Sequence, residues 1–229
     1  KRTSRGGDGI MAQHTVQLDI VKTTFVDRSN RGSNYGSLEY IRTGDGDFAE
    51  NRYYAFIDWD HSELLQRKRI ISAELHLYSR RSVTMPTGRG IYHGEIRSSW
   101  DENTATYNNV TFPSATYYSE FLFTDNISSG TEVIMNISPY AMSLPYGISL
   151  FGPSSPGVYA EFNSTRASSN KPYINVVYED VPPSAPTPKS PIGIYKDSRS
   201  AIRFEWQYNS DVGGTQKAFD LQWSTDQAN

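Results

Sequence analysis

The sequence predicts an all-β protein whose main domain is an antiparallel β-sandwich of jelly-roll type, followed by part of a second, immunoglobulin- or fibronectin-like β-domain. Aromatic residues make up 13% of the 229 residues, with 16 Tyr and 10 Phe, and aromatic side chains pack well on the pleated surface of a sheet. Short segments with a two-residue hydrophobic alternation recur along the chain, and clusters of Gly, Asn, Asp, Ser and Pro separate them. Helix signals are weak.

Ten segments within the first 180 residues are predicted to be strands. The clearest is 71–78, where Ile71, Ala73, Leu75 and Leu77 fall on one face, which we expect to be buried, while polar side chains alternate on the other. The other nine predicted strands cover residues 16–26, 38–42, 52–58, 91–98, 117–123, 132–137, 148–151, 158–163 and 173–178.

One short helical turn is expected over residues 138–143. Ser138 could cap its first turn, and Pro139 suits the first helical position because proline has no N–H to lose there. This segment is the best helix candidate in a sequence whose helix signals are weak.

A proline-dense stretch at residues 181–191 predicts an extended, stiff linker. Beyond it, the expected strands 202–206 and 219–224, joined through Gly213-Gly214, are similar to the opening of a fibronectin type III domain. Only about 40 residues of that domain are present, against roughly 100 in a complete sandwich. Met11 could be a native start. The expected organisation is an N-terminal extension (1–13, a tag or a remnant), the sandwich (14–180), the linker (181–191) and the partial domain (192–229).

Composition and motifs argue against several functions. The net charge is only −3, so a field strong enough to attract nucleic acid is not expected. There is no cysteine, and no apolar run approaches the roughly 20 residues that span a bilayer. The sequence holds no Gly-x-Ser-x-Gly elbow and no phosphate-binding Gly-rich loop. We therefore predict neither an enzyme, nor nucleic-acid binding, nor membrane insertion.

Five sequence motifs follow one another in order over residues 15–180. They are Asp27 with Asn34-x-Gly36, Phe56-Ile57-Asp58, Ile71-Ser72-Ala73-Glu74-Leu75-x-Leu77-Tyr78, Trp100-Asp101-Glu102-x-Thr104-x-Thr106-Tyr107-Asn108, and Pro172-x-Ile174-x-Val176-x-Tyr178. Together they resemble the DNRLRE-type carbohydrate-binding module family. The sequence departs from the family's pattern at Tyr107, where Trp is usual, and at Asn136, where Asp is usual.

Members of that family are attached to polysaccharide-active enzymes, cell-surface proteins and some phage virion proteins. The resemblance therefore implies a non-catalytic role, a polysaccharide or cell-surface glycan as partner, other domains in a longer chain, and a place outside the cell, on its surface or in a virion.

Aromatic side chains beside arginines are candidates for sugar binding, because rings cover the apolar faces of sugars and guanidinium groups bind their oxygens. Strand alternation places Tyr40 with Arg42 on one face and Arg52 with Tyr54 on another, while Arg80 ends a further strand. These five residues are the predicted ligand platform. The alternative is that the tyrosines are half-buried packing and the arginines are solvated, which is the commoner situation for such side chains.

Two tryptophans could also present a ring. Trp59 follows a predicted strand and precedes a loop, so we include it among the ligand candidates, although burial is an equally good interpretation. Trp100 lies in the segment 98–109, which we expect to be a structural clasp in which Glu102 and Thr104 hydrogen-bond to the backbone.

A structural calcium ion is the only cofactor for which the sequence offers ligands. Asp27 and Asn34 flank an irregular loop and supply the oxygen atoms that calcium prefers. Asp45 and Asp47 offer two more carboxylates, outside any EF-hand pattern. Ordinary turn chemistry explains both loops equally well.

Two functions remain open at this point. The first is a carbohydrate-binding or adhesion module of a larger surface or virion-associated protein. The alternative is a structural spacer or assembly block of a phage tail or surface fibre, without a ligand of its own. A polysaccharide-degrading activity would require a catalytic domain elsewhere in a longer chain.

Overall fold

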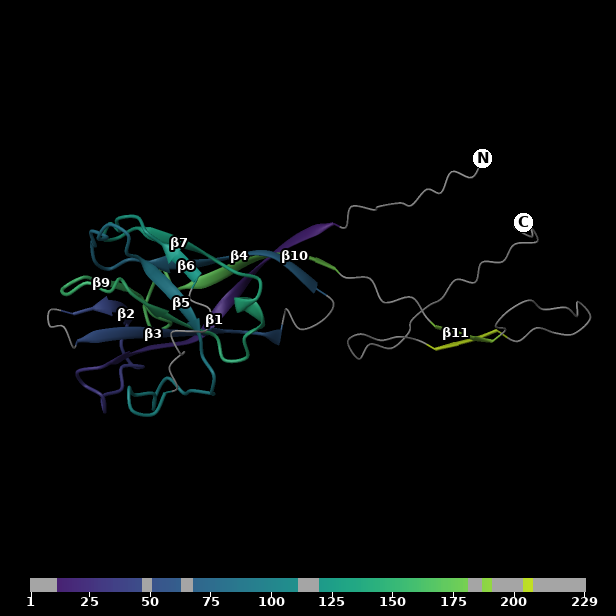
Figure 1. Cartoon of the computed structure of the whole chain (residues 1–229), viewed down its shortest axis with the longest axis horizontal. Coiled ribbons are helices and arrows are strands. Elements are labelled where there is room, and N and C mark those ends of the chain that lie inside the picture. The colour runs from purple at the N-terminus through teal and green to yellow at the C-terminus, as the bar shows by residue number, and fades with distance from the viewer. Residues whose placement is uncertain are drawn as a thin grey trace, which may run out of the picture.

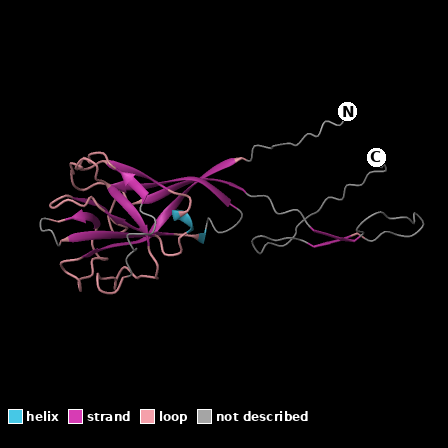
Figure 2. Ribbon diagram, in the orientation of Figure 1, coloured by secondary structure: helices cyan, strands magenta, loops and turns pink. Residues whose placement is uncertain are grey.

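The computed structural model describes residues 12–46, 51–62, 68–110, 120–180, 187–190 and 204–207. The predicted all-β architecture is confirmed, since an antiparallel β-sandwich dominates the structure (Figures 1 and 2). Ten strands form one curled sheet: β1 (Gln13–Asp27), β2 (Tyr40–Asp45), β3 (Arg52–Trp59), β4 (Lys68–Tyr78), β5 (Ile91–Glu95), β6 (Glu120–Phe123), β7 (Glu132–Ile137), β8 (Ile148–Phe151), β9 (Tyr159–Asn163) and β10 (Tyr173–Asp180).

Strand β1 belongs to both layers of the sandwich. Residues 13–19 of β1 pair with β10, which continues to β4 and β7 in one layer. From Ile20 onward β1 pairs instead with β3, which continues to β8, β5 and β6 in the other layer, and β2 and β9 extend that layer from β3. The register shifts between Ile20 and Lys22, so an extra residue, Val21, sits at the change of layer. Such a bulge bends a strand and increases its twist.

All ten predicted strands are present, and β7 and β8 have the predicted ends. One residue of the clearest strand was predicted on the wrong face: Ile71 is 38% exposed rather than buried. The register between β4 and β10 shifts at this point, since Ser72 faces Val177 and Ile70 faces Tyr178. Ile71 is therefore an inserted residue, and Ile70 packs against the core in its place.

The expected helical turn is a short 3-10 helix, η2, at Ala141–Ser143. Ser138 Oγ accepts a hydrogen bond of 3.2 Å from the N–H of Ala141, so this side chain stabilises the turn as predicted. Apart from Ser62, which also has 3-10 conformation, the remaining regular structure of the described residues is strand, which agrees with the weak helix signals.

Two hydrophobic clusters fill the sandwich, and β3 contributes to both. Its residues Ala55, Ile57 and Trp59 lie in the main core between the layers. Its Phe56 lies in a second cluster with Val26, Ile96, Trp100 and Ala105, which packs beneath the loop after β5. A strand covered on both faces is apolar on both, and this explains why alternation is weak in β3.

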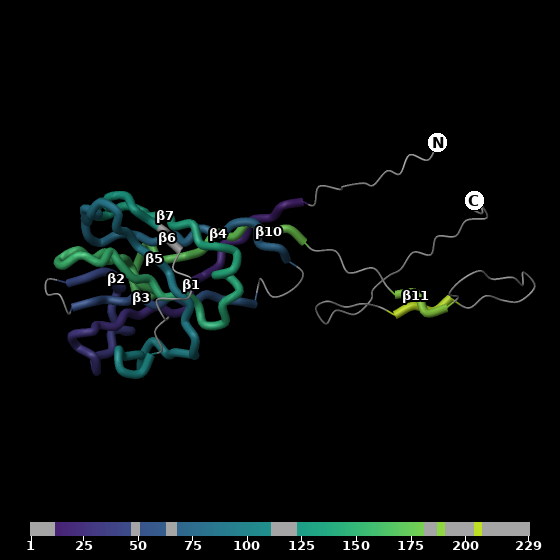
Figure 3. Tube along the Cα trace, in the orientation of Figure 1, coloured from purple at the N-terminus to yellow at the C-terminus, as the bar shows by residue number. Residues whose placement is uncertain are grey.

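The segment around Trp100 is the predicted structural clasp. Trp100 is 8% exposed, and its indole N–H donates to the carbonyl of Tyr146 at 2.9 Å. The main partner of this segment, however, is Asn34. The side-chain amide of Asn34 donates to the carbonyl oxygens of Glu102 and Ala105, both at 2.8 Å. The loop after β1 and the loop after β5 therefore lie side by side (lower edge of Figure 3).

Gly36 completes this clasp. A Cβ atom at Gly36 would lie 1.8 Å from the carbonyl oxygen of Glu102, so only glycine allows the two backbones to approach so closely. Asn34 and Gly36 form the Asn-x-Gly motif of the sequence, and the structure explains both of its residues through one contact with Glu102.

A separate two-stranded sheet pairs β11 (Thr187–Ser190) with β12 (Glu205–Gln207). Residues 187–190 of the predicted linker are thus extended, and they pair with the strand that contains Trp206. The predicted strand 219–224 lies outside the described residues. The fibronectin-like character of this region stays a prediction.

We expect Gly36→Ala to lower the free energy of unfolding by about 1–3 kcal/mol, because the added methyl group forces the two loops apart. We expect Asn34→Ala to cost about 1–2 kcal/mol, because two carbonyl groups lose their donor. Urea unfolding measures both changes. Gly32→Ala is the matched control in the same loop, since a Cβ there meets nothing within 4 Å. Equal stability of the Gly36 and Gly32 variants would contradict the clasp.

Candidate functional site

Basic and aromatic side chains gather on the outer side of the β2–β9 pair. Arg42 of β2 lies directly opposite Glu161 of β9, and Tyr159 lies opposite Gly44. The end of β4 reaches the same place, because Ser79 forms a bridge with Phe162. We call this the arginine–tyrosine surface and define it by Tyr40, Arg42, Arg80, Arg81, Tyr159 and Glu161.

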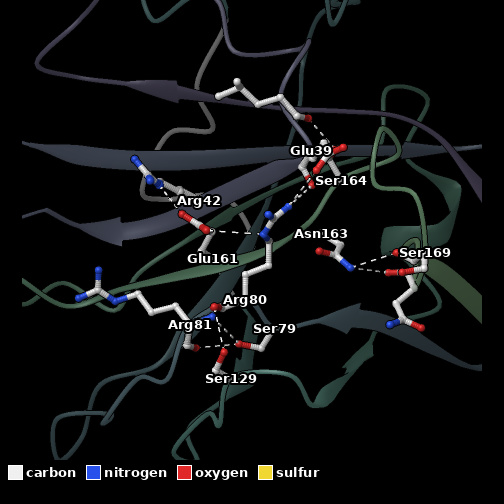
Figure 4. A network of polar contacts seen from close by, with 12 residues as sticks. Glu39, Arg42, Ser79, Arg80, Arg81, Ser129, Glu161, Asn163, Ser164 and Ser169 are labelled. Carbon is white, nitrogen blue, oxygen red and sulfur yellow. Dashed lines mark hydrogen bonds and ion pairs between the residues drawn. The ribbon is translucent and has the colours of Figure 1, made fainter.

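Glu161 is the central anion of this surface. Its carboxylate accepts a hydrogen bond of 2.8 Å from Arg42 Nε, and Arg80 Nε lies 3.9 Å away on its other oxygen (Figure 4). Burial acts to lower the pKa of Arg42, but Glu161 and the neighbouring tyrosines more than compensate, so the pKa is raised. Arg42 is therefore a permanent cation.

Aromatic rings surround the Arg42 guanidinium. It lies 4.7 Å from the ring centre of Tyr40 and 5.3 Å from that of Tyr159. Beneath it is Phe25, which is 1% exposed and stacks on Tyr35 at 4.3 Å. Each cation–π contact contributes about 0.5–2 kcal/mol depending on exposure. The guanidinium is held in place by rings as well as by Glu161.

The backbone of the arginine pair at the end of β4 is fixed by hydrogen bonds. The N–H of Arg80 donates to the carbonyl of Glu161 at 2.8 Å, and its carbonyl accepts from the Ser129 hydroxyl at 3.0 Å. The Arg81 guanidinium lies 4.0 Å from the ring centre of Tyr159 and extends away from the Glu161 pairs (Figure 4). Within the described residues, no carboxylate pairs with Arg81.

A hollow of about 360 Å³ adjoins Arg80, and its lining includes Glu39, Ser129, Asn163 and Asn170. The Asn163 amide donates to the carbonyls of Ser169 and Asn170, so the loop that closes this hollow is tied to β9. One ring (Tyr78), one guanidinium (Arg80) and one carboxylate (Glu39) line the hollow, and these groups can contact both the apolar faces and the hydroxyls of a sugar.

The structure brings three of the predicted ligand residues together: Tyr40, Arg42 and Arg80. The other predicted strand-face pair, Arg52 and Tyr54, has different partners. Arg52 Nε donates to Asp45 at 2.8 Å. Tyr54 packs against the second hydrophobic cluster. Alternation correctly placed each pair on a strand face, but it could not show which strands are neighbours.

Trp59 cannot present its ring to a ligand, since it is 1% exposed in the main core. Strand β3 continues to Trp59, which pairs with Ile20 of β1. Trp59 therefore points inward, as Ala55 and Ile57 do. The expectation of an exposed platform at this position was wrong, because the predicted strand ended one residue too early.

The two proposed calcium ligands have separate roles. Asp27 accepts hydrogen bonds from the Ser29 N–H at 2.8 Å and from the Asn30 amide at 2.6 Å, which is turn chemistry. Asn34 holds the clasp, and its side-chain oxygen accepts from the N–H of Gly36. The described residues contain no group of three or more His, Asp or Glu that could hold a metal ion. A calcium ion at Asp27 and Asn34 stays a prediction.

Sequence reasoning missed Tyr159 and Glu161, although it predicted their strand. Both residues are polar or amphipathic and lie two positions apart, so alternation could have placed them on one outer face. Nothing in the sequence indicates that this face adjoins Arg42, because β2 and β9 are separated by more than a hundred residues and their pairing is set by the fold.

Comparison with known families gives one match. The model of carbohydrate-binding module family 96 matches residues 14–178 of the chain. No curated protein matches the chain. The carbohydrate-binding part of the resemblance seen in the sequence is thus confirmed, while its DNRLRE type stays a prediction. Among the described residues, no helix is long and apolar enough to cross a membrane.

The Arg42–Glu161 pair should contribute measurably to stability. A double-mutant cycle with Arg42→Met and Glu161→Gln is expected to give a coupling free energy of about 1 kcal/mol, because the two side chains are only 26% and 17% exposed. The matched control is Arg80→Met with Glu39→Gln, a pair 3.8 Å apart in which Glu39 is 61% exposed. The coupling free energy of this control pair should be smaller than that of Arg42 and Glu161. A larger value would contradict the central role of Glu161.

Proposed function

Because the chain belongs to carbohydrate-binding module family 96, we propose that it is a non-catalytic module that holds a polysaccharide or cell-surface glycan on the arginine–tyrosine surface. Family membership supports the class of ligand. The gathering of Tyr40, Tyr159 and three arginines where the β2–β9 pair meets the chain after β4 supports the place, and it is the single observation on which the location of the site rests.

Each part of the surface has a role in this proposal. The Tyr40 and Tyr159 rings contact the apolar faces of sugar units. Arg81 and the exposed part of Arg80 donate hydrogen bonds to hydroxyl or carboxylate oxygens, and guanidinium groups do this in a bidentate manner. Glu161 and Phe25 keep Arg42 in one conformation, so little side-chain entropy is lost when a ligand binds.

We further propose that the module serves a larger surface or virion-associated protein, outside the cell, on its surface or in a virion, with other domains of the same chain as neighbours. The resemblance of its motifs to modules in such proteins supports this setting. The runner-up is a structural spacer without a ligand. One observation favours it: Arg42 and Arg80 already have a carboxylate partner in Glu161.

Affinity electrophoresis against soluble anionic and neutral polysaccharides tests the proposal. We expect the wild-type chain to be retarded in at least one gel. Arg81→Ala and Tyr159→Ala should each weaken retardation by an anionic polysaccharide about tenfold, the loss expected for one charge-assisted hydrogen bond or one stacked ring. Lys68→Ala removes a cation at the opposite end of β4 and should bind like the wild type.

Unfolding curves of each variant show that the fold is retained. If no polysaccharide retards the chain, the binding function is refuted and the structural spacer is the function that remains. Retardation by an anionic polysaccharide that neither Arg81→Ala nor Tyr159→Ala changes would refute the arginine–tyrosine surface as its place.

A further inference from the structure

The outer face of the other layer carries a second set of polar side chains. On β7, β4, β10 and β1, the inward residues form the main core, so the alternate residues point outward. One row across these strands consists of Ile134, His76, Tyr173 and Asp19, which lie opposite one another in register. Ile134 is 46% exposed and adds an apolar contact to this row.

The next row consists of Asn136, Glu74, Asn175 and Gln17, again in register across the four strands. Three amides and one carboxylate thus stand side by side across the outer face of these strands. Such side chains offer paired donors and acceptors at strand spacing, roughly 4.8 Å apart from strand to strand. Hydroxyl groups along a sugar chain match this pattern. We call the two rows, together with Glu132, the amide–carboxylate face.

A fixed aromatic pair lies in the middle of this face. The rings of His76 and Tyr173 stack with centres 4.3 Å apart. Glu132 bridges them, since Oε1 lies 3.1 Å from His76 Nδ1 and accepts a hydrogen bond of 3.0 Å from the Tyr173 hydroxyl. The Asn175 amide lies 3.1 Å from His76 Nε2. These contacts hold Tyr173 in one orientation before any ligand arrives.

A hollow of about 230 Å³ opens beside this pair, and its lining includes His76, Glu132, Asn170, Lys171 and Tyr173. Pockets for drug-sized molecules span roughly 300–1,000 Å³. The hollow is therefore sized for one sugar unit, with the rows of the amide–carboxylate face available to the units that follow it.

The charge of this face is opposite to that of the arginine–tyrosine surface. The face carries the carboxylates of Glu74, Glu132 and Asp19, and Lys171 is the one lysine or arginine that lines the hollow beside His76 and Tyr173. Burial raises the pKa of the Tyr173 hydroxyl, and its hydrogen bond and proximity to Glu132 raise it further. A negatively charged glycan would be repelled here, whereas an uncharged one would not.

We infer that the amide–carboxylate face is a second glycan-binding surface, which takes an uncharged, hydroxyl-rich sugar chain and works independently of the arginine–tyrosine surface. Tyr173 and Ile134 contact the apolar faces of the sugar units. Asn175, Asn136 and the two glutamates bind the hydroxyls. A protein partner fits less well, because Ile134 is the only large exposed apolar side chain in these two rows.

The test uses the full chain with three soluble neutral polysaccharides: hydroxyethylcellulose, a galactomannan and a xylan. We expect retardation in at least one of these gels. Tyr173→Ala should weaken it about tenfold, the loss expected of one stacked ring. Tyr173→Phe keeps the ring and should lose only a few-fold. Tyr140→Ala, which removes a 49% exposed tyrosine beyond the other end of β7, is the matched control and should bind like the wild type.

Arg81→Ala distinguishes the two surfaces. It should leave neutral-polysaccharide binding unchanged, while Tyr173→Ala should leave any binding through the arginine–tyrosine surface unchanged. Lack of retardation by all three neutral polysaccharides would overturn the inference, as would equal losses for Tyr173→Ala and Tyr140→Ala. Neutral binding that Arg81→Ala abolishes would assign the ligand to the first surface and overturn the second.

Discussion

The change of layer within β1 is the constraint on which both candidate surfaces depend. One half of this strand pairs with β10 and the other with β3, and the bulge at Val21 turns the chain between them. Because side chains alternate along a strand, an inserted residue also resets which residues face inward. The first half of β1 presents Gln17 and Asp19 outward on one layer, and the second half buries Phe25 beneath Arg42 on the other.

Two loops extend this constraint to the edge of the sandwich. Phe25 stacks on Tyr35, which belongs to the loop after β1. The same loop carries Asn34 and Gly36, which grip the backbone at Glu102. Glu102 in turn forms an ion pair with Arg166, in the loop that leads from β9 to β10. The position of β9 is thus tied to the clasp, and β9 supplies Tyr159 and Glu161.

The two surfaces differ in the way their polar groups are arranged. On the arginine–tyrosine surface, cations converge on one central carboxylate and are held by rings, which leaves the outer guanidinium of Arg81 extended. On the amide–carboxylate face, neutral amides and carboxylates follow the strand register, and one bridged aromatic pair stands among them. A module with both would discriminate between glycans by charge, since the carboxylates of the amide–carboxylate face repel an anionic glycan that the arginines of the other surface attract.

Alternation and turn signals in the sequence determined the ten strands, the buried parity of most of them, and the absence of any large helical element, because these features depend only on local periodicity. They failed at Ile71 and Trp59, where a bulge and a longer strand changed the expected face. The pairing of β2 with β9 and of β4 with β10 was decided by the tertiary structure alone. Arg42 meets Glu161, and His76 meets Tyr173, only because strands distant in the chain become neighbours in the sheet, and no local pattern encodes that choice.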